Sequence, residues 1–342
     1  MAEIKPNYDT KRKKLAEIIP LASPFTVYIE QTKYCNFKCF YCIHSTRDEE
    51  GGEFRALGHR MQHMDESFFE KIIRELKEFP QDGVKRIVFS GLGEPLMNPR
   101  LPEYVRMAVE AQIAGRVEVI TNGLLLTPEK SRALVEAGIT NINISVQGLD
   151  AAGYEETCGI RIDFERYLEN LKYLYEHKGN VQIYIKAIDA TLGTKENEEK
   201  FFEIFSPFAD RIYIEHLVVM QQQMDGLREI VDGSKNFYGE ELDVNRKVCA
   251  QSFYFMQIGC EGDIFPCPVP GLGKNLSMGN AKEHTLTEIW NGSRRRGFLR
   301  KMLKKEKDQI PDCATCTCFN AINNPMERLD DDAERLLPLF AD

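Results

Sequence analysis

From about residue 25 to residue 216, short apolar runs alternate with stretches in which apolar residues recur every three or four positions. The short runs are rich in β-branched residues and end in turn-forming or polar segments, which is typical of buried strands. They predict strands at Phe25–Glu30, Arg86–Ser90, Val117–Thr121, Asn141–Val146, Val181–Ile188 and Arg211–Glu215. Six strands that alternate with helices predict a parallel α/β sheet with right-handed crossovers, either doubly wound or rolled into a partial barrel.

Helical signals lie between the predicted strands. Phe68, Ile72, Leu76 and Phe79 have helical spacing after an expected Asp65 N-cap. Thr127-Pro128 opens another helix that Gly138 can close, and Pro102 suits a further helix start. Because ligands of such sheets gather at the C-terminal ends of the strands, we expect the functional site at that edge.

The alternation stops after Glu215, and residues 249–318 carry cysteines with only short elements between them. Loops of that kind need a cross-link to keep one conformation, so this region predicts a small metal-dependent module. The expected division is an N-terminal extension (1–24), a barrel (25–221), a polar linker (222–248), the cysteine module (249–325) and a C-terminal tail (326–342), with an acidic amphipathic helix at Leu329–Phe340.

The composition is that of an ordinary globular protein of 342 residues, with 43% hydrophobic residues and a formal net charge of -9. No apolar run reaches membrane-spanning length and the N-terminus does not resemble a signal peptide, so we expect a cytoplasmic protein without a membrane partner. The excess of acidic residues argues against a nucleic-acid partner. In a reducing compartment, the ten clustered cysteines indicate metal ligands or redox chemistry rather than disulfides.

The first cysteine group, Cys35, Cys39 and Cys42, has the spacing C-x3-C-x2-C directly after the first predicted strand. Three thiolates would leave one iron of a 4Fe-4S cluster without a protein ligand. A zinc site closed by His44 is the alternative.

This motif, with the aromatic Tyr41 before its last cysteine, resembles the signature of the radical S-adenosylmethionine (SAM) superfamily. Family members carry a glycine-rich turn after the second strand, and Gly91-Leu92-Gly93-Glu94-Pro95 occupies that place here. The resemblance implies a partial (β/α)6 TIM-like barrel in which Gly91, Gly93 and Glu94 contact the methionine end of SAM. Glycines permit close backbone approach, and a carboxylate can pair with an amino group.

Thr121 and Asn122 after the third strand and Ser145 after the fourth resemble the family's ribose-facing positions. Gln147 departs from the acid that relatives often have there. The resemblance further implies an external one-electron donor such as flavodoxin or ferredoxin, reductive cleavage of SAM at the open iron, and a 5'-deoxyadenosyl radical held close to its target hydrogen.

The second cysteine group runs from Cys249 through Gly262-x4-Cys267 to Cys313-x2-Cys316. This order resembles the SPASM and shorter twitch modules that hold auxiliary iron-sulfur clusters in radical SAM enzymes, including 2-deoxy-scyllo-inosamine dehydrogenase and anaerobic sulfatase-maturating enzymes. After the first three cysteines are subtracted, seven remain, one fewer than two four-cysteine clusters need. We therefore expect one auxiliary cluster of the 4Fe-4S type on Cys249, Cys267, Cys313 and Cys316, with a zinc ribbon on the same residues as the alternative.

Cys158, Cys260 and Cys318 are left without an assignment. Each is read as a buried thiol, a hydrogen-atom donor to a substrate radical, or, for Cys260 and Cys318, a substitute cluster ligand. We expect Cys158 to be the one that can face the barrel opening.

Other charged residues offer weaker signals. The basic run between Arg294 and Lys307 is read as the solvated face of a helix in preference to a site for an anion, a leader peptide or nucleic acid. Glu215, His216 and Lys186 lie at strand ends, where a substrate-facing acid, base or cation would be useful.

The leading hypothesis is a two-electron dehydrogenation of a small-molecule or peptide substrate, with the auxiliary cluster as electron acceptor and Glu215 or His216 as general base. An epimerase would instead need Cys158, Cys260 or Cys318 as hydrogen donor. Maturation of a ribosomally made peptide is a third hypothesis, and only about 25 residues precede the first strand, too few for a leader-binding domain. A non-catalytic iron-sulfur or zinc protein is the fourth, and the residues that resemble SAM contacts argue against it.

Overall fold

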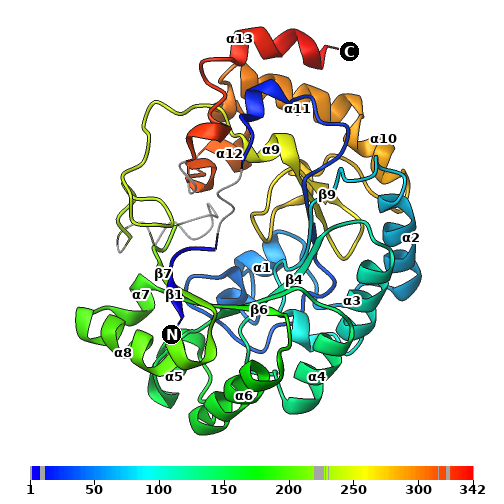
Figure 1. Cartoon of the computed structure of the whole chain (residues 1–342). Helices are drawn as coiled ribbons and strands as arrows, with labels where there is room; N and C mark the ends of the chain where they lie inside the picture. Colours follow the sequence, from blue (N-terminus) through cyan, green and yellow to red (C-terminus); the bar gives the residue numbers. More distant parts are fainter. Residues whose placement is uncertain are drawn as a thin grey trace.

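The computed structural model describes residues 2–7, 12–218, 227, 229, 231–314, 316–320 and 324–341. Figure 1 shows a sheet with helices along its outer side, and a cysteine-rich module of short elements beside it that includes the C-terminal helix. The predicted linker, 222–248, and the predicted barrel end at residue 221 lie partly outside the described residues, so the domain boundaries stay predictions.

Within the described residues, one sheet contains nine strands in the order β1-β7-β6-β5-β4-β3-β2-β8-β9. The strands are β1 (Glu3–Ile4), β2 (Thr26–Ile29), β3 (Arg86–Phe89), β4 (Arg116–Thr121), β5 (Asn141–Ser145), β6 (Gln182–Ile188), β7 (Arg211–Glu215), β8 (Phe255–Ile258) and β9 (Ile264–Phe265). All neighbours are parallel except β8 and β9. The six predicted strands are β2 to β7 and are confirmed.

The helices that follow the strands cover the outer face of the sheet (Figure 1). They are α2 (Glu66–Leu76), α3 (Leu101–Glu110), α4 (Pro128–Glu136), α5 (Ala151–Cys158), α6 (Phe164–His177), α7 (Asp189–Leu192) and α8 (Lys195–Phe205), and the short α1 (Glu53–Ala56) lies in the loop after β2. Thr127 caps α4 by accepting a hydrogen bond from the Lys130 amide, and Gly138 follows it with a positive φ of 86°. Asp65 lies at the N-cap of α2, but its side chain makes no capping hydrogen bond.

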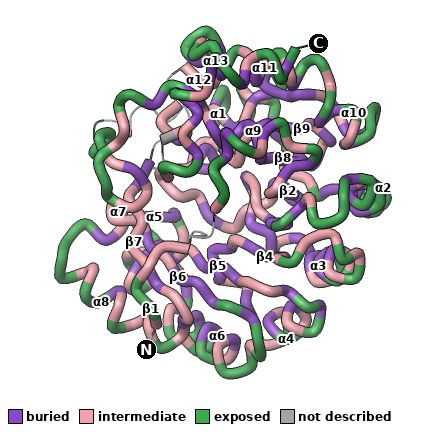
Figure 2. The backbone as a smooth tube through the Cα atoms, turned by 45° about the horizontal axis from the view of Figure 1, so that its top comes forward, coloured by how far each residue is buried: buried purple, intermediate pink, exposed green. Residues whose placement is uncertain are grey.

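The two faces of the strands differ in chemistry. Ile87, Val119 and Ile142 face the helices and belong to the main hydrophobic core. Figure 2 shows mostly buried strands, and helices around them whose colours alternate between buried, intermediate and exposed. The alternate positions carry polar groups. Glu118 has no solvent exposure and accepts hydrogen bonds from the Arg86 and Arg116 guanidiniums and from the Asn143 amide. The interior of the partial barrel is therefore polar.

The C-terminal module contains α9 (Gln251–Tyr254), α10 (Leu286–Trp290), α11 (Ser293–Leu303), α12 (Pro311–Ala314) and α13 (Ala333–Leu336). Strand β8 pairs in parallel with β2, so the sheet continues from the barrel into the module. The predicted C-terminal helix is shorter than expected, because after α13 the residues Leu337–Phe340 form a 3-10 turn around Pro338.

The basic run is only in part a solvated face, which corrects the sequence interpretation. Arg295 is buried, and its guanidinium lies 3.3 Å from the centre of the Trp290 ring. It also donates hydrogen bonds to the carbonyls of Ser252 and Phe253. Arg295 therefore joins α11 to α9 and α10, whereas Arg294 and Lys301 are exposed.

Among the described residues, every helix is too short or too polar to span a bilayer.

Candidate active site

The loop after β2 carries the first cysteine group and is held by its neighbours. The Cys42 amide donates to the Cys39 carbonyl at 2.9 Å, which closes a turn between these two cysteines. Arg47 donates from Nη1 to the carbonyls of Cys35 and Phe37, at 2.9 and 2.7 Å. The loop is thus ordered by contacts of the chain itself.

The three thiols lie in a buried environment that needs a positive partner. Burial raises the pKa of Cys42 to about 12, and the nearby Cys39 adds to this. The pKa of Cys35 is raised by burial and by the charges of Glu94, Cys42 and Cys39. Thiolates are strongly disfavoured here unless cations compensate them, and the irons of a cluster supply that compensation. The loop supplies three thiols and no fourth one. This number fits a 4Fe-4S cluster in which one iron has no protein ligand.

His44 does not support the zinc alternative. Its ring is buried and lies 5.0 Å from the Phe54 ring, in a small apolar cluster with Ile43 and Leu92. Burial lowers the pKa of His44 to about 4.

The glycine-rich turn after β3 contacts the cysteine loop directly. A Cβ atom on Gly93 would lie 2.3 Å from the Thr32 carbonyl oxygen, so only glycine fits there without a backbone shift. A Cβ atom on Gly91 would lie 2.6 Å from Glu30. The next amide, of Glu94, donates to the Tyr34 carbonyl at 2.8 Å. Both glycines therefore serve the packing of the turn against the loop, and their contact with SAM stays a prediction.

Glu94 joins the turn after β3 to the end of β4. Its carboxylate is buried and accepts hydrogen bonds from Thr121 Oγ1 at 2.6 Å, from the Asn122 amide at 2.7 Å and from the Leu96 amide at 2.9 Å. Burial raises the pKa of Glu94, and these donors oppose that effect. The structure thus brings together Glu94, Thr121 and Asn122, three residues that the resemblance assigns to SAM. The Glu94 carboxylate already accepts hydrogen bonds from donors of the protein itself.

Tyr41 and Ser145 meet through Gln147. The Tyr41 hydroxyl donates to Gln147 Oε1, and Gln147 Nε2 donates to the Ser145 carbonyl at 3.2 Å. Burial raises the pKa of Tyr41, so the phenol keeps its proton and remains a donor. The residue that departs from the family pattern therefore connects the cysteine loop to the end of β5.

The second cysteine group surrounds one cavity. Its lining includes five thiols, Cys249, Cys267, Cys313, Cys316 and Cys318. Burial raises the pKa of Cys249 to about 11, and Cys316 adds to this. Within the described part of the chain, no three thiols converge as they would on a single ion.

Lys307 holds the Cys313–Cys316 segment in place. Its ammonium donates to the carbonyls of Cys313 at 2.5 Å and Ala314 at 3.1 Å, with the Cys316 carbonyl at 3.5 Å. It also lies 4.6 Å from the centre of the Phe319 ring. A buried cation therefore lies directly beside the cavity, a feature that the sequence analysis read only as part of a basic run.

Glu215, the last residue of β7, belongs to a polar group that it shares with β6. Its carboxylate accepts from Lys186 Nζ at 2.5 Å and from the Tyr184 hydroxyl at 3.2 Å. Burial, followed by the charge of Glu215, raises the pKa of Tyr184, which keeps the phenol protonated. The structure thus pairs the predicted Glu215 and Lys186 and adds Tyr184 to them.

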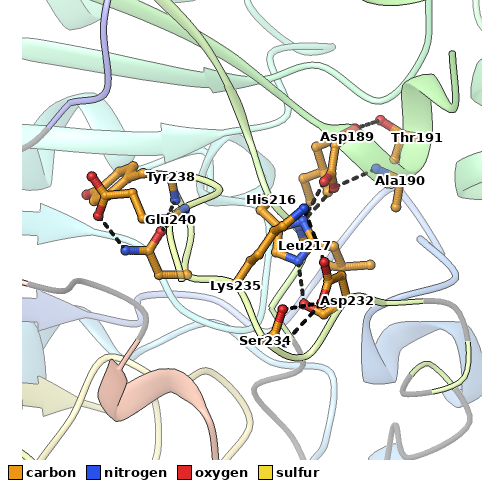
Figure 3. Close-up of polar contacts among 12 residues, drawn as sticks. Asp189, Ala190, Thr191, His216, Leu217, Asp232, Ser234, Lys235, Tyr238 and Glu240 are labelled. Carbon is orange, nitrogen blue, oxygen red and sulfur yellow. Dashed lines mark hydrogen bonds and ion pairs between the residues drawn. The ribbon is translucent and has the colours of Figure 1, made fainter. Parts of the chain in front are cut away.

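His216 has acceptors at both ring nitrogens (Figure 3). Nδ1 lies 2.5 Å from Asp189 Oδ2, and Nε2 lies 2.9 Å from the Asp232 carbonyl. Asp189 also accepts from the Leu217 amide at 3.0 Å. His216 therefore joins the start of α7 to the segment around Asp232, and no ring nitrogen is left for a substrate in this arrangement.

The three unassigned thiols are all buried. The sulfur of Cys158 lies 3.7 Å from the sulfur of Cys39 in the cysteine loop, and its position relative to the barrel opening stays a prediction. Cys260 donates to the Glu30 carbonyl at 2.9 Å and does not line the auxiliary cavity. Cys318 lines that cavity.

Sequence reasoning also missed a buried charged group around Lys33. Lys33 Nζ lies 2.6 Å from Glu261 Oε2, 3.2 Å from His59 Nδ1 and 3.7 Å from Glu30 Oε1. Because an ammonium only donates, Nδ1 of His59 accepts and the proton is on Nε2. The position of Glu30 directly after β2 was the one available signal, since the other members come from distant loops.

Comparison with known proteins places these features in context. A model of the radical SAM superfamily matches residues 29–206, and a model of the SPASM iron-sulfur cluster-binding domain matches residues 249–317. The chain is similar to the tungsten-containing aldehyde ferredoxin oxidoreductase cofactor-modifying protein of Pyrococcus furiosus, with 25% identity over 337 residues that cover 86% of this chain and 88% of that protein.

Two further similarities concern a peptide cyclase and a solved structure. The chain is 25% identical over 329 residues to the PqqA peptide cyclase of Streptomyces rochei, covering 87% of this chain and 85% of the cyclase. The crystal structure of BtrN in complex with AdoMet and 2-DOIA has a TM-score of 0.55 at 19% identity and covers 86% of this chain and 92% of BtrN. At that identity the likeness establishes the shared fold.

Proposed function

The chain belongs to the radical SAM superfamily and carries a SPASM domain, and from this premise we propose that it oxidises its substrate by two electrons. The cofactors of this family are SAM, the 4Fe-4S cluster that binds it, and auxiliary iron-sulfur clusters of the SPASM domain. When bound, these groups supply a 5'-deoxyadenosyl radical that takes one hydrogen atom and an acceptor for the second electron.

The chain supplies ligands, orientation and proton transfer. The SAM-binding cluster would be held by Cys35, Cys39 and Cys42. The auxiliary cluster would be held by Cys249 and Cys267 together with two of the three thiols Cys313, Cys316 and Cys318. The cavity offers five thiols for four positions.

We assign Glu215 as the base that receives the proton of a substrate hydroxyl or amine. Lys186 and Tyr184 orient its carboxylate from one side. His216 has both nitrogens engaged, so it positions α7 and the segment around Asp232 instead.

One observation supports oxidation over epimerisation. An epimerase needs a thiol that can return a hydrogen atom to a substrate radical, and all ten cysteines lie within the described residues. Cys158 contacts Cys39, Cys260 donates to a carbonyl and Cys318 lines the auxiliary cavity. Each of these three is at most 3% exposed. The thiols that would hold an auxiliary acceptor thus line one cavity, whereas the three thiols left as hydrogen donors are buried, which supports oxidation.

The test is product analysis under anaerobic conditions. The reconstituted enzyme is incubated with SAM, reductant and a panel of candidate alcohol, amine and peptide substrates. We expect loss of two hydrogens from one substrate and one 5'-deoxyadenosine per product. A product that has the mass of the substrate in H2O and carries one added deuterium in D2O would establish epimerisation and contradict the proposal.

A second candidate is maturation of a peptide, which the similarity to the PqqA peptide cyclase favours. Ring closure between two side chains also removes two hydrogens, so mass alone does not separate it from dehydrogenation. Fragment spectra of the peptide separate the two reactions, because a cross-link suppresses fragmentation between the joined residues.

The source of the first electron is proposed from the family resemblance. A flavodoxin or ferredoxin would supply it, and a cytoplasmic location stays a prediction of the sequence.

A further inference from the structure

Cys158 lies against the first cysteine group although it is far away in the sequence. It is the last residue of α5 and is 119 residues from Cys39, yet the two sulfurs are 3.7 Å apart. Its side chain is 1% exposed. The distance is within the range of a hydrogen bond between sulfur atoms.

The backbone holds this contact in place. The amide of Lys38 donates to the Cys158 carbonyl at 2.9 Å, and the amide of Phe40 donates to the Thr157 carbonyl at 3.0 Å. Both residues next to Cys39 are thus bonded to the end of α5. The contact between the sulfurs is therefore built into the way the loop is attached to the helix.

The direction of the hydrogen bond follows from the chemistry of the ligand. When Cys39 binds iron it is a thiolate and has no proton to donate. The Cys158 thiol, which is not a ligand in this arrangement, is then the only member of the pair that can donate. The bond must then run from the Cys158 thiol to the Cys39 sulfur.

Hydrogen bonds to ligating sulfurs are one of the features that set the reduction potential of an iron-sulfur cluster. The reduced cluster carries one more negative charge than the oxidised one. A donor to a ligand sulfur stabilises the reduced form more, so it raises the potential.

We propose that Cys158 is a positioning residue for the SAM-binding cluster, whose thiol donates a hydrogen bond to the Cys39 sulfur and raises the reduction potential of that cluster. It is not a fourth ligand in this arrangement, because two sulfurs in contact with each other cannot bind separate irons of one cluster. The proposal depends on the cluster and is independent of the substrate and of the reaction proposed above.

The experiment measures the midpoint potential of the SAM-sensitive cluster in the full-length holoenzyme. The wild type is compared with Cys158→Ala, which lacks the donor, and Cys158→Ser, which keeps one. Cys260→Ala is the matched control, because it removes another buried thiol that contacts Glu30 and not the cluster loop. EPR-monitored titrations are run without SAM, and the relevant signal is identified in each sample by its change when SAM is added.

We expect Cys158→Ala to lower the midpoint potential, so that at a fixed potential the ratio of reduced to oxidised cluster falls by up to about tenfold. Tenfold corresponds to about 59 mV for a one-electron couple. Cys158→Ser should keep most of the wild-type potential, and Cys260→Ala should keep all of it.

Three results would overturn the proposal. They are an unchanged potential in Cys158→Ala with full iron content, an equal fall in the alanine and serine variants, and spectroscopic evidence of a fourth thiolate on the SAM-free wild-type cluster. If Cys158→Ala does not retain the cluster, the serine variant decides: a wild-type potential supports the proposal, and loss of the cluster contradicts it.

Discussion

Replacing Lys307 with methionine tests whether this residue organises the auxiliary site. The side chain of Lys307 is 9% exposed, and its ammonium donates to the carbonyls of Cys313 and Ala314 at 2.5 and 3.1 Å. Methionine has a similar length and apolar volume but no donor, so the substitution removes the hydrogen bonds with little change in packing.

The size of the effect follows from these contacts. A hydrogen bond from a charged group contributes about 1.5–3 kcal/mol. If the long contact to Cys316 at 3.5 Å is counted as zero, the two shorter bonds give about 3–6 kcal/mol. Because the wild type also desolvates an ammonium, we take about 3 kcal/mol, which corresponds to a factor of roughly 100 in the opening equilibrium of the segment.

The assay compares Lys307→Met with the wild type, with Lys307→Arg, and with Lys304→Met as an exposed control. In the cluster-free proteins, alkylation of Cys313 and Cys316 is followed by mass spectrometry, and we expect it to be roughly 100-fold faster in Lys307→Met. After reconstitution, iron should fall from about eight to about four atoms per chain, since two four-iron clusters become one. Wild-type alkylation rates together with full iron content in Lys307→Met would refute the reasoning.

Three other substitutions test other parts of the structure. Gly93→Ala places a Cβ atom 2.3 Å from the Thr32 carbonyl oxygen; SAM binding measured by calorimetry should weaken at least tenfold because the turn must shift away from the cysteine loop, and wild-type affinity would contradict the close approach. Glu118→Gln leaves two guanidiniums without their buried carboxylate and should lower the free energy of unfolding by about 3 kcal/mol in urea titrations, whereas the exposed Glu103→Gln should change it little. Glu215→Gln should slow product formation about 100-fold or more while SAM cleavage without substrate stays normal, and equal turnover would exclude Glu215 as the base.

The barrel strands were predictable because their signals are local. Short β-branched runs bounded by polar segments identified β2 to β7, and the pattern of apolar residues identified the helices between them. Strands β1 and β8 were missed for the opposite reason. Each is short, and each is defined by a partner more than 200 residues away, β7 for β1 and β2 for β8. A short apolar segment does not reveal by itself whether such a partner exists.

Arg295 illustrates a similar limit in the module. Its sequence context is a run of basic residues, which usually indicates a solvated helix face. One of these residues nevertheless lies over the Trp290 ring and is buried. Helical periodicity shows which residues share a face, but it does not show which face a neighbouring element covers.

The sequence by itself determined the cofactor chemistry. The spacing of Cys35, Cys39 and Cys42 and the glycine-rich turn are short-range features, because a loop that holds a cluster can place its ligands within a few residues of one another. The second cysteine group is spread from Cys249 to Cys316, and the order of its cysteines and of Gly262 is what the sequence shows. The resemblance to radical SAM enzymes followed from these features, and the comparisons confirm it.

Only the tertiary structure decided where the remaining groups lie. Cys158 reaches Cys39, Cys318 joins the auxiliary cavity, and Cys260 lies beside Glu30. His216 is engaged at both nitrogens by residues from two other segments. These contacts join segments that are 16 to 230 residues apart, and such distances are set by how the helices and strands pack together, which no local pattern in the sequence records.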